Sequence, residues 1–486
     1  MNVVSRAIRQ IDRIGGTEQE PSDLLPLWLC NPSTGARIAQ AAATDLVEVE
    51  RAIAIADEVH SSGIWSGLAI DERSTYLMRV ADLLDPYAED VAAAEAIGSG
   101  VVISVTELFA GALAGSFRQA VELIADGWWH TNLSEDGRCI ELLRLPWGPV
   151  VVLVPWNAPA AIAAKKIAFA LAAGAPVILK PPERAPFGCN FLADAICAAR
   201  LPRGVFQMVH GGVDVGQLLT TDPRIRAVSF TGSVHTGRSI ARAGAEDFKA
   251  LQLELGGNNP VVVRADADIE ETARALAEGI VKLNGQWCEG PGKIFVPRTR
   301  HDEFVQALQA HLQKYVIGAH DDPSAQIGPL AHEAHRNRLN DQVQRMVNLG
   351  ALVVMGGVEP DLDGWFWAPR VVVGAEPADC MDELFGPVVT VHPVDSDSEA
   401  VALANDSPYG LAGYVFGADI KAAMSVGRDM RFGEVKVNGT SILDLSPSSV
   451  QSFWRSSGLG GHGDRDTIRF FCGTQIVGVD KAGLPI

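Results

Sequence analysis

A chain of 486 residues is longer than one hydrophobic core usually supports, so its length predicts two or three lobes. Hydrophobic residues make up 47% and aromatic residues 7%, which is typical of a folded globular protein and excludes a disordered chain. The formal net charge of -19 would repel nucleic acid and anionic membranes, so we expect neither as a partner.

Seven cysteines are scattered along the chain, and they form neither a Cys-x-x-Cys pair nor a Cys/His metal spacing. This pattern favours reduced thiols and predicts no metal site. The first residues carry arginines with no apolar run behind them, so no secretory signal is expected. The apolar stretch 158–179 contains Lys165 and Lys166, and we interpret it as a buried helix leading into a buried strand. These features favour a cytoplasmic protein without a membrane span.

From Gly148 onward, short Val/Ile-rich runs alternate with Ala-rich helical stretches, which is typical of strand-helix units in a parallel sheet. The strands expected in the first lobe are 150–154, 177–179, 205–209, 227–230 and 251–255, and this lobe is expected to end near Gly256. After it, strands 261–263 and 294–296 flank a helix over 269–282. The sequence therefore predicts an α/β fold, with a Rossmann-like doubly wound domain followed by a second α/β domain.

Two strand-like runs lie outside this alternation, at Cys139 to Leu145 and at Ile468 to Val479. Both could pair between subunits. No internal repeat is visible, so a solenoid or array is excluded.

Three polar residues are candidates for catalysis, and each has an ordinary structural alternative. Cys288 lies in a Gly-containing turn, either as a small buried side chain or as a thiol held in a cleft. Glu254 ends an apolar strand, where it either faces solvent or serves as a general base with a pKa raised by apolar surroundings. Asn157 follows strand 150–154 and is either a turn residue bonded to its own backbone or a donor to a developing alkoxide.

The segment Phe230-Thr231-Gly232-Ser233 follows a strand and opens a helix around 238–243. Exposed N-H groups and the helix dipole at such a terminus favour a phosphate group. The spacing is not Gly-x-Gly-x-x-Gly, so this is an anion site without the usual dinucleotide motif.

Six segments, in their order along the chain, resemble motifs of the aldehyde dehydrogenase superfamily. They are Pro155-Trp156-Asn157, Lys180-Pro181-Pro182-Glu183, Phe230-Thr231-Gly232-Ser233, Glu254-Leu255-Gly256-Gly257, Gly285-Gln286-Trp287-Cys288 and Glu383-Leu384-Phe385-Gly386-Pro387. Further matches near residues 31–35, 328–330 and 405–411 extend the resemblance across nearly the whole chain.

The resemblance implies an enzyme that oxidises an aldehyde to a carboxylic acid with reduction of NAD. By this resemblance, Cys288 attacks the aldehyde carbonyl, and Asn157 and the backbone N-H of Cys288 hold the resulting alkoxide. Hydride transfer leaves a thioester, which water activated by Glu254 hydrolyses. Because Glu254 is present, release of a free acid is favoured over transfer of the acyl group to coenzyme A.

The resemblance also assigns the cofactor contacts. Lys180 and Glu183 match the pair that holds the adenosine ribose, and a carboxylate there would repel a 2′-phosphate, so NAD is expected in preference to NADP. Glu383 and Phe385 match residues that grip the nicotinamide ribose and ring. The other matched contacts are Trp156, Gly212, Phe230, Gly232, Ser233 and Leu255, of which Phe230 and Leu255 could equally be plain core residues.

In domain terms, the resemblance implies an NAD-binding domain over 1–125 and 147–255 and a catalytic domain over 256–442. It also implies oligomerisation strands over 126–146 and 468–486. A homodimer or a homotetramer is expected, without a choice between them.

Some positions depart from the family pattern. The segment 450–455 differs from relatives, and Gly461-His462 stands where relatives commonly have Arg-Glu, in a region that borders the substrate entrance. Glu289 could select substrates by charge, or could face solvent or pair with Lys293, while Trp287 could narrow the pocket.

Three alternatives remain open: an acylating dehydrogenase, an NADP-linked one, and a family member kept as a structural or binding protein. The physiological aldehyde is not indicated, although tryptophans near the matched positions favour an apolar or aromatic one.

Overall fold

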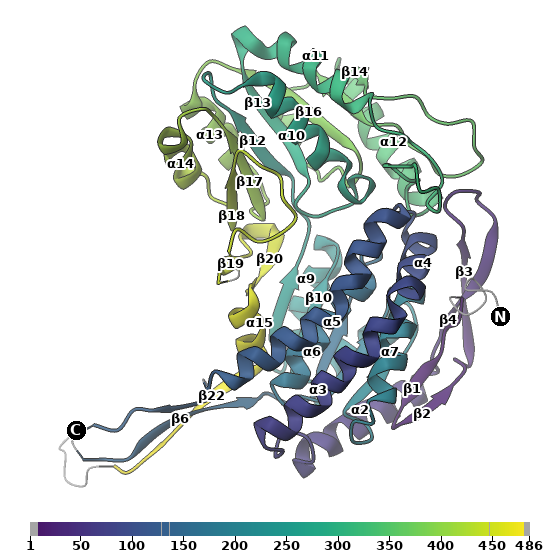
Figure 1. The fold of residues 1–486 in the computed structure, drawn as a ribbon, viewed down its shortest axis with the longest axis vertical. Helices are drawn as coiled ribbons and strands as arrows, with labels where there is room; N and C mark the ends of the chain where they lie inside the picture. Colours follow the sequence, from purple (N-terminus) through teal and green to yellow (C-terminus); the bar gives the residue numbers. More distant parts are fainter. Residues whose placement is uncertain (1–7, 128, 136, 447, 481–486) are drawn as a thin grey trace.

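The computed structural model describes residues 8–127, 129–135, 137–446 and 448–480. They form two α/β lobes, each built around its own sheet, and an arm that projects from the lower lobe in Figure 1. The predicted fold class, with a doubly wound first domain and a second α/β domain, is confirmed.

The first lobe contains an eight-stranded sheet. Its strands, in spatial order, are β2 (Thr17–Gln19), β1 (Asp12–Ile14), β9 (Phe206–Met208), β8 (Val177–Lys180), β7 (Val150–Leu153), β10 (Ala227–Thr231), β11 (Ala250–Glu254) and β20 (Gly458–Leu459). The five inner strands from β9 to β11 are parallel and are the five that the sequence predicts. Both edges are antiparallel additions from the chain's two ends, and the sequence patterns did not predict them.

The register of the inner strands brings their carboxyl ends to one edge of the sheet. Phe230 of β10 pairs with Leu153 of β7, and Thr231 pairs with Glu254 at the end of β11. Strands β7 and β8 are buried along their whole length because helices cover the sheet. The helices that follow β7, β8, β9 and β10 are, in this order, α6 (Pro159–Ala172), α7 (Phe187–Ala198), α8 (Val213–Thr221) and α9 (Val234–Ala245).

Four earlier helices also belong to the first lobe: α2 (Leu46–Ser62), α3 (Ile70–Leu84), α4 (Ala88–Ser99) and α5 (Ile103–Ala125). Within the part of the chain that the structure describes, α5 is the one helix long and apolar enough to cross a membrane by length and composition. It packs against α3, α4 and α6, and Phe117 and Ile124 are fully buried there. Its buried apolar residues therefore serve this packing.

The second lobe contains a seven-stranded sheet, parallel except at one edge. Its strands, in spatial order, are β14 (Leu352–Met355), β15 (Arg370–Val373), β16 (Val388–Val394), β13 (Pro291–Pro297), β12 (Asn259–Val263), β17 (Ala412–Phe416) and β18 (Glu434–Val437). Its helices are α10 (Ile269–Val281), α11 (His301–Leu312), α12 (Glu333–Asn348), α13 (Asp397–Asn405) and α14 (Ile420–Asp429). The predicted strands 261–263 and 294–296 and the helix between them are confirmed.

The arm consists of β5 (His130–Asn132), β6 (Ile140–Pro146) and β22 (Cys472–Gly478), joined in one antiparallel sheet (Figure 1). The two strand-like runs predicted from the sequence thus pair with each other inside one chain. The run predicted over Ile468 to Val479 is partly wrong, because Ile468 to Phe470 belong to helix α15 (Asp464–Phe470). Acidic residues in its first turn favour that helix.

The remaining strands are the hairpin of β3 (Asp23–Cys30) and β4 (Arg37–Ala43) and the short pair of β19 (Gln451–Ser452) and β21 (Gly461–His462). The domain boundaries predicted from the resemblance stay predictions, and residues 1–7, 128, 136 and 481–486 of those ranges lie outside the described residues.

Candidate functional site

A pocket of about 360 Å³ opens where the two lobes meet. From the first lobe it is lined by Pro155, Trp156, Asn157, Ile162, Thr231, Gly232, Ser233, Val234, Glu254, Leu255 and Gly256. From the second lobe it is lined by Cys288, Arg338, Gln342, Asp382, Glu383, Phe385 and Tyr409. The structure therefore brings together all three predicted catalytic residues and six of the predicted cofactor contacts.

Cys288 follows a turn whose backbone is held in an uncommon conformation. Leu283, Asn284 and Gly285 have φ values of 51°, 57° and 75°, in the left-handed region. At Gly285 a Cβ would collide with the backbone of Pro387, so only glycine fits. The turn needs external support because left-handed residues in sequence are strained.

Two side chains supply that support. The Asn284 amide donates to the carbonyls of Gly100 at 2.8 Å and Pro329 at 3.0 Å, and its Oδ1 accepts from the N-H of Gly328 at 2.8 Å. Gln286 is fully buried, and its Oε1 accepts from the N-H of Ala331 at 2.9 Å. These contacts fix the position of the loop 283–288 that carries Cys288, and the sequence patterns did not single out Asn284 for this role.

Asn157 lies just beyond β7, beside this loop. Its Nδ2 donates to the carbonyl of Gln286 at 2.8 Å. The side chain is thus bonded across to the loop 283–288 and not to its own backbone. An amide in this position can donate to an oxygen that develops charge next to Cys288.

The Cys288 thiol lies among negative groups. Burial raises its pKa well above the ordinary value, and the carboxylates of Glu254, Glu289 and Glu383 raise it further. Ionisation of this thiol therefore needs a compensating positive charge in the pocket.

Glu254 ends β11 with its side chain 14% exposed, and it contacts a lysine and a histidine. Lys166 Nζ lies 3.5 Å from its Oε2, and His462 Nδ1 lies 3.3 Å from its Oε1. Thr231 donates to Oε2 at 3.4 Å. The carboxylate is therefore neither solvent-facing nor in the apolar setting that the sequence suggested.

The expectation that the pKa of Glu254 is raised is wrong. Burial alone would raise it, but Lys166 and the hydrogen bond from His462 outweigh burial and hold the pKa of Glu254 well below its ordinary value. Lys166 comes from α6, where a lysine inside an apolar helix was the signal that a buried partner exists.

Glu383 and Phe385 enter the pocket from the second lobe. Burial raises the pKa of Glu383 to about 7, opposed by the N-H of Gly257, which donates to its Oε1 at 3.1 Å. Phe385 packs edge-on against Trp156, with ring centroids 5.4 Å apart. The two rings are nearly perpendicular, with an interplanar angle of 87°, and they give the pocket an apolar aromatic lining that can contact a planar ring.

Arg338 and Gln342 of α12 also line the pocket, and the sequence analysis missed both. Arg338 donates to Nδ1 of His335 at 2.9 Å, while Gln342 donates to the carbonyl of Glu383 at 3.0 Å. They lie four residues apart on one face of the helix. This spacing could not identify them as pocket residues from the sequence alone, because it does not show that α12 borders the pocket.

Four predicted cofactor contacts lie outside the pocket lining. Lys180 Nζ is bonded to the carbonyls of Gly211 at 2.8 Å and Pro181 at 3.0 Å, and it lies 3.4 Å from Glu183 Oε2. Gly212 caps the start of α8 beside this pair. Phe230 is buried under Gly232, where its ring fills the space that a Cβ would need.

Ser233, which lines the pocket, is the N-cap of α9. Its hydroxyl accepts from the N-H of Thr236 at 3.2 Å. Phe230, Gly232 and Ser233 thus form the turn from β10 into α9 that the sequence predicts as an anion site.

Two of the placements expected for Glu289, facing solvent and pairing with Lys293, are wrong. Its side chain is buried, accepts from Gln451 Nε2 at 3.1 Å and lies 3.8 Å from Lys436 Nζ, so it neither faces solvent nor pairs with Lys293. It does not line the pocket either. Trp287 is also buried and donates to the carbonyl of Gly279 at 3.0 Å, outside the pocket lining.

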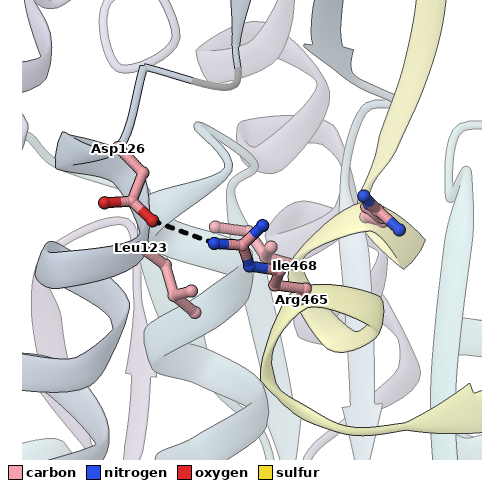
Figure 2. A pocket seen from close by; sticks show the side chains of 5 residues that line it. Leu123, Asp126, Arg465 and Ile468 are labelled. Carbon is pink, nitrogen blue, oxygen red and sulfur yellow. Dashed lines mark hydrogen bonds and ion pairs between the residues drawn. The ribbon is translucent and has the colours of Figure 1, made fainter. Parts of the chain in front are cut away.

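A second pocket of about 140 Å³ lies between α5 and α15, at the base of the arm (Figure 2). Leu123 and Ile468 form its wall, and Arg465 reaches the carboxylate of Asp126 at 3.2 Å. It contains none of the predicted site residues. Among the described residues, no group of three or more His, Cys, Asp and Glu side chains is placed to hold a metal ion.

Known proteins match this chain over almost its whole length. The model of the aldehyde dehydrogenase family matches residues 22–477. The chain is 34% identical to a geranial dehydrogenase of Castellaniella defragrans, covering 88% of this chain and 90% of that one. It is 33% identical to a 2-hydroxymuconic semialdehyde dehydrogenase of a Pseudomonas species, covering 91% of this chain and 93% of that one.

Solved structures agree with the fold. A betaine aldehyde dehydrogenase from Staphylococcus aureus in complex with NAD+ superimposes with a TM-score of 0.93 at 27% identity, covering 100% of this chain and 99% of that one. A cysteine-to-alanine mutant of aldehyde dehydrogenase C from Pseudomonas syringae, complexed with NAD+ and octanal, superimposes with a TM-score of 0.90 at 29% identity. The coverage is 96% of both chains.

Proposed function

The chain belongs to the aldehyde dehydrogenase family, and we propose on that basis that it oxidises an aldehyde to the free carboxylic acid with reduction of NAD. The observation that carries this proposal is the meeting of Cys288, Glu254 and Asn157 in one pocket, although they come from different elements far apart in the sequence. A thiol, a carboxylate and an amide donor around one space suit attack on a carbonyl followed by hydrolysis.

In the proposed reaction, Cys288 loses its thiol proton to solvent, its sulfur forms a bond to the aldehyde carbon, and the carbonyl oxygen becomes an alkoxide. Asn157 Nδ2 turns from the carbonyl of Gln286 to donate to this oxygen, together with the backbone N-H of Cys288. Loss of hydride from the carbon leaves a thioester on Cys288. Glu254 then removes a proton from a water that attacks the thioester, the C-S bond breaks, and the acid is released with the thiol restored.

The pocket fits a dinucleotide. The aromatic lining of Trp156 and Phe385 suits the nicotinamide ring, and the carboxyl of Glu383 suits ribose hydroxyls. The turn at Gly232 and Ser233 opens a helix whose start favours a pyrophosphate. When bound, NAD+ accepts the hydride and brings a positive charge to a pocket rich in carboxylates.

We propose NAD in preference to NADP because of the Lys180 and Glu183 pair. Glu183 is 39% exposed and can accept from both ribose hydroxyls, while its charge would repel a 2′-phosphate. Leu255 and Gly212 complete the cofactor contacts of the first lobe in this proposal.

The domain roles follow the same logic. Residues 1–125 and 147–255 would bind NAD, residues 256–442 would carry the nucleophile, and residues 126–146 and 468–486 would join subunits. Exposed apolar side chains on the arm, Leu145, Ile476 and Val477, support a homodimer or homotetramer. We propose a cytoplasmic location, consistent with the free cysteines among the described residues.

The test is to mix the protein with NAD and a panel of aldehydes and to follow NADH absorbance and acid formation. We expect NADH and free acid in equal amounts, loss of both in Cys288→Ser, and no loss in the control Cys197→Ser, whose exposed cysteine lies outside this pocket. Dependence on coenzyme A would indicate an acylating enzyme, and faster turnover with NADP would indicate an NADP-linked one. No NADH with any aldehyde would contradict the proposed function and favour a structural or binding protein.

A further inference from the structure

His462 lies beside Glu254, and the fold holds it there firmly. The imidazole belongs to β21, whose backbone pairs with Gln451 of β19, and Gln252 of β11 donates to the carbonyl of Gly461 at 2.7 Å. The ring packs edge-on against Phe453 with centroids 5.4 Å apart. The side chain is 16% exposed, so its contacts are with the protein and not with bulk water.

Both ring nitrogens face carboxylates. Nδ1 lies 3.3 Å from Glu254 Oε1, and Nε2 lies 3.6 Å from Asp444 Oδ1 without a hydrogen bond to any described residue. Asp444 is 33% exposed, so it connects the ring to solvent. His462 therefore bridges a buried carboxylate and a surface one.

Other charged groups close to the ring act in opposite directions. The negative charge of Glu289 favours protonation of the imidazole, and the positive charge of Lys166 disfavours it. Asp464 of the adjoining helix α15 is directed elsewhere, because its carboxylate contacts Lys165 and Gln119. The balance of charge around the ring is negative.

This balance changes the proton affinity of both partners. Burial would lower the pKa of His462, but the hydrogen bond to Glu254 and the charges of Glu254 and Glu289 raise it above its ordinary value. The same contact holds the pKa of Glu254 low. A carboxylate that pairs with two cations is a weak base, and a weak base removes a proton from water slowly.

We propose that His462 is a positioning residue that sets the strength of the Glu254 base: when protonated it keeps Glu254 weak, and when it releases its proton past Asp444 it leaves Glu254 paired with Lys166 alone and a stronger base for activating water. The inference deepens the proposed function and rests on it. It concerns only hydrolysis of the thioester, because formation of the thioester does not use Glu254.

The test measures the rate of acid release from the acylated enzyme by chemical quench, between about pH 6 and 9, where a histidine with a raised pKa changes charge. In the unaltered protein this rate should rise with pH as His462 becomes neutral. In His462→Gln, which keeps a donor for Glu254 but cannot titrate, the rise should disappear. At pH 6 this variant should release acid faster than the unaltered protein by roughly threefold to tenfold, because its base is stronger.

A second variant tests the outer carboxylate. Asp444→Asn removes a negative charge beside Nε2, so the pH at which the rate rises should move to a lower value. The matched control is Asp466→Asn on α15, where the carboxylate pairs with Arg469 at 3.7 Å, and the rise should stay in place.

An NMR titration of the histidine rings gives a readout that needs no substrate. The signal of His462, identified by its loss in His462→Gln, should titrate at the pH where acid release rises, and Glu254→Gln should lower that pH. An unmoved signal in Glu254→Gln, or an unchanged pH profile in His462→Gln, would overturn the role of His462. If the histidine variant failed to give its first NADH turnover, Asp444→Asn would decide, because an unshifted profile there also overturns the role.

The two proposals fail in different ways. A protein that produces no NADH from any aldehyde contradicts the proposed function. A protein that produces NADH and acid with a pH profile indifferent to His462 and Asp444 contradicts only this inference.

Discussion

Replacing Glu254 with glutamine separates the two halves of the proposed reaction. Glutamine keeps the shape of the side chain but cannot accept a proton from water. We expect Glu254→Gln to form the thioester and release one NADH per Cys288, and then to turn over more slowly by about 10²- to 10⁴-fold, the usual contribution of a general base. Rapid-mixing absorbance of NADH measures both phases in one trace.

The same substitution has a cost in stability that follows from the distances in the site. Lys166 and His462 lie 3.5 and 3.3 Å from the carboxylate, and opposite charges about 4 Å apart attract by about 4 kcal/mol at an effective dielectric constant of 20. Removing one member of a buried pair typically costs about 3–5 kcal/mol, because the remaining charge is uncompensated. We expect a loss of this size in the free energy of unfolding.

The pH dependence of that loss identifies its source. Burial lowers the pKa of Lys166 even in the unaltered protein, and a base whose folded pKa is lowered destabilises the fold most when it is charged. The loss in Glu254→Gln should therefore shrink as the pH rises toward the ordinary lysine pKa of 10.5. Replacing Lys166 with methionine in the same chain should restore much of the stability, because both charges are then gone.

Two results would refute this reasoning. Steady-state turnover in Glu254→Gln equal to that of the unaltered protein would mean that another group activates the water. If Glu254→Gln is folded, as judged by a cooperative unfolding transition, but gives no first NADH turnover, then Glu254 acts in thioester formation.

Three further predictions use single substitutions. Burial raises the pKa of Glu95 to about 8, so the folded state favours its protonated form and the protein loses stability as the pH rises from about 4.5 through 8. Glu95→Gln, which keeps the acceptor for the N-H of Ala160, should therefore have a higher thermal unfolding temperature above pH 8 and an equal one below pH 4.5; a constant difference would contradict this. Asn157→Ala should slow the first NADH turnover by about 10²- to 10³-fold, measured with saturating NAD and aldehyde, and an unchanged first turnover would exclude Asn157 as the alkoxide donor. Gly285→Ala should abolish the first turnover, because its φ of 75° and its contact with Pro387 leave no room for a Cβ, and a normal first turnover would show that the loop tolerates the shift.

The sequence predicts the five inner strands of the first lobe and strands β12 and β13 of the second lobe because each is a short, mostly apolar run between helical stretches. It does not predict the edges. The strand Asp12–Ile14 contains two charged residues, and the strand Gly458–Leu459 is two residues long, so neither has a pattern that a local analysis can detect. These edges depend on pairing with β9 and β11, which is a tertiary interaction.

The members of the site were predictable, but their electrostatics were not. The family motifs, found in their order along the chain, predicted Cys288, Glu254 and Asn157. The charge state of Glu254 depends on His462, which lies 208 residues away, and the position of Glu289 depends on Gln451, which lies 162 residues away. Local sequence around a carboxylate gives its burial, which raises its pKa, but the partners that reverse this effect come from other elements.

Two buried carboxyl groups in this pocket illustrate what those partners do. Glu383 and Glu254 are both shielded from water, yet the pKa of Glu383 is raised to about 7 whereas that of Glu254 is lowered. The effect of burial on the pKa of Glu383 is opposed mainly by one backbone N-H, while at Glu254 it is opposed by a lysine and a histidine. Glu254 therefore stays ionised in this pocket, as the proposed activation of water requires. Since the same charge raises the pKa of the Cys288 thiol, formation of the thiolate requires a positive charge in the pocket, and the nicotinamide ring of NAD+ carries one. In the proposed reaction, the charges that keep Glu254 ionised therefore make the nucleophile dependent on the cofactor.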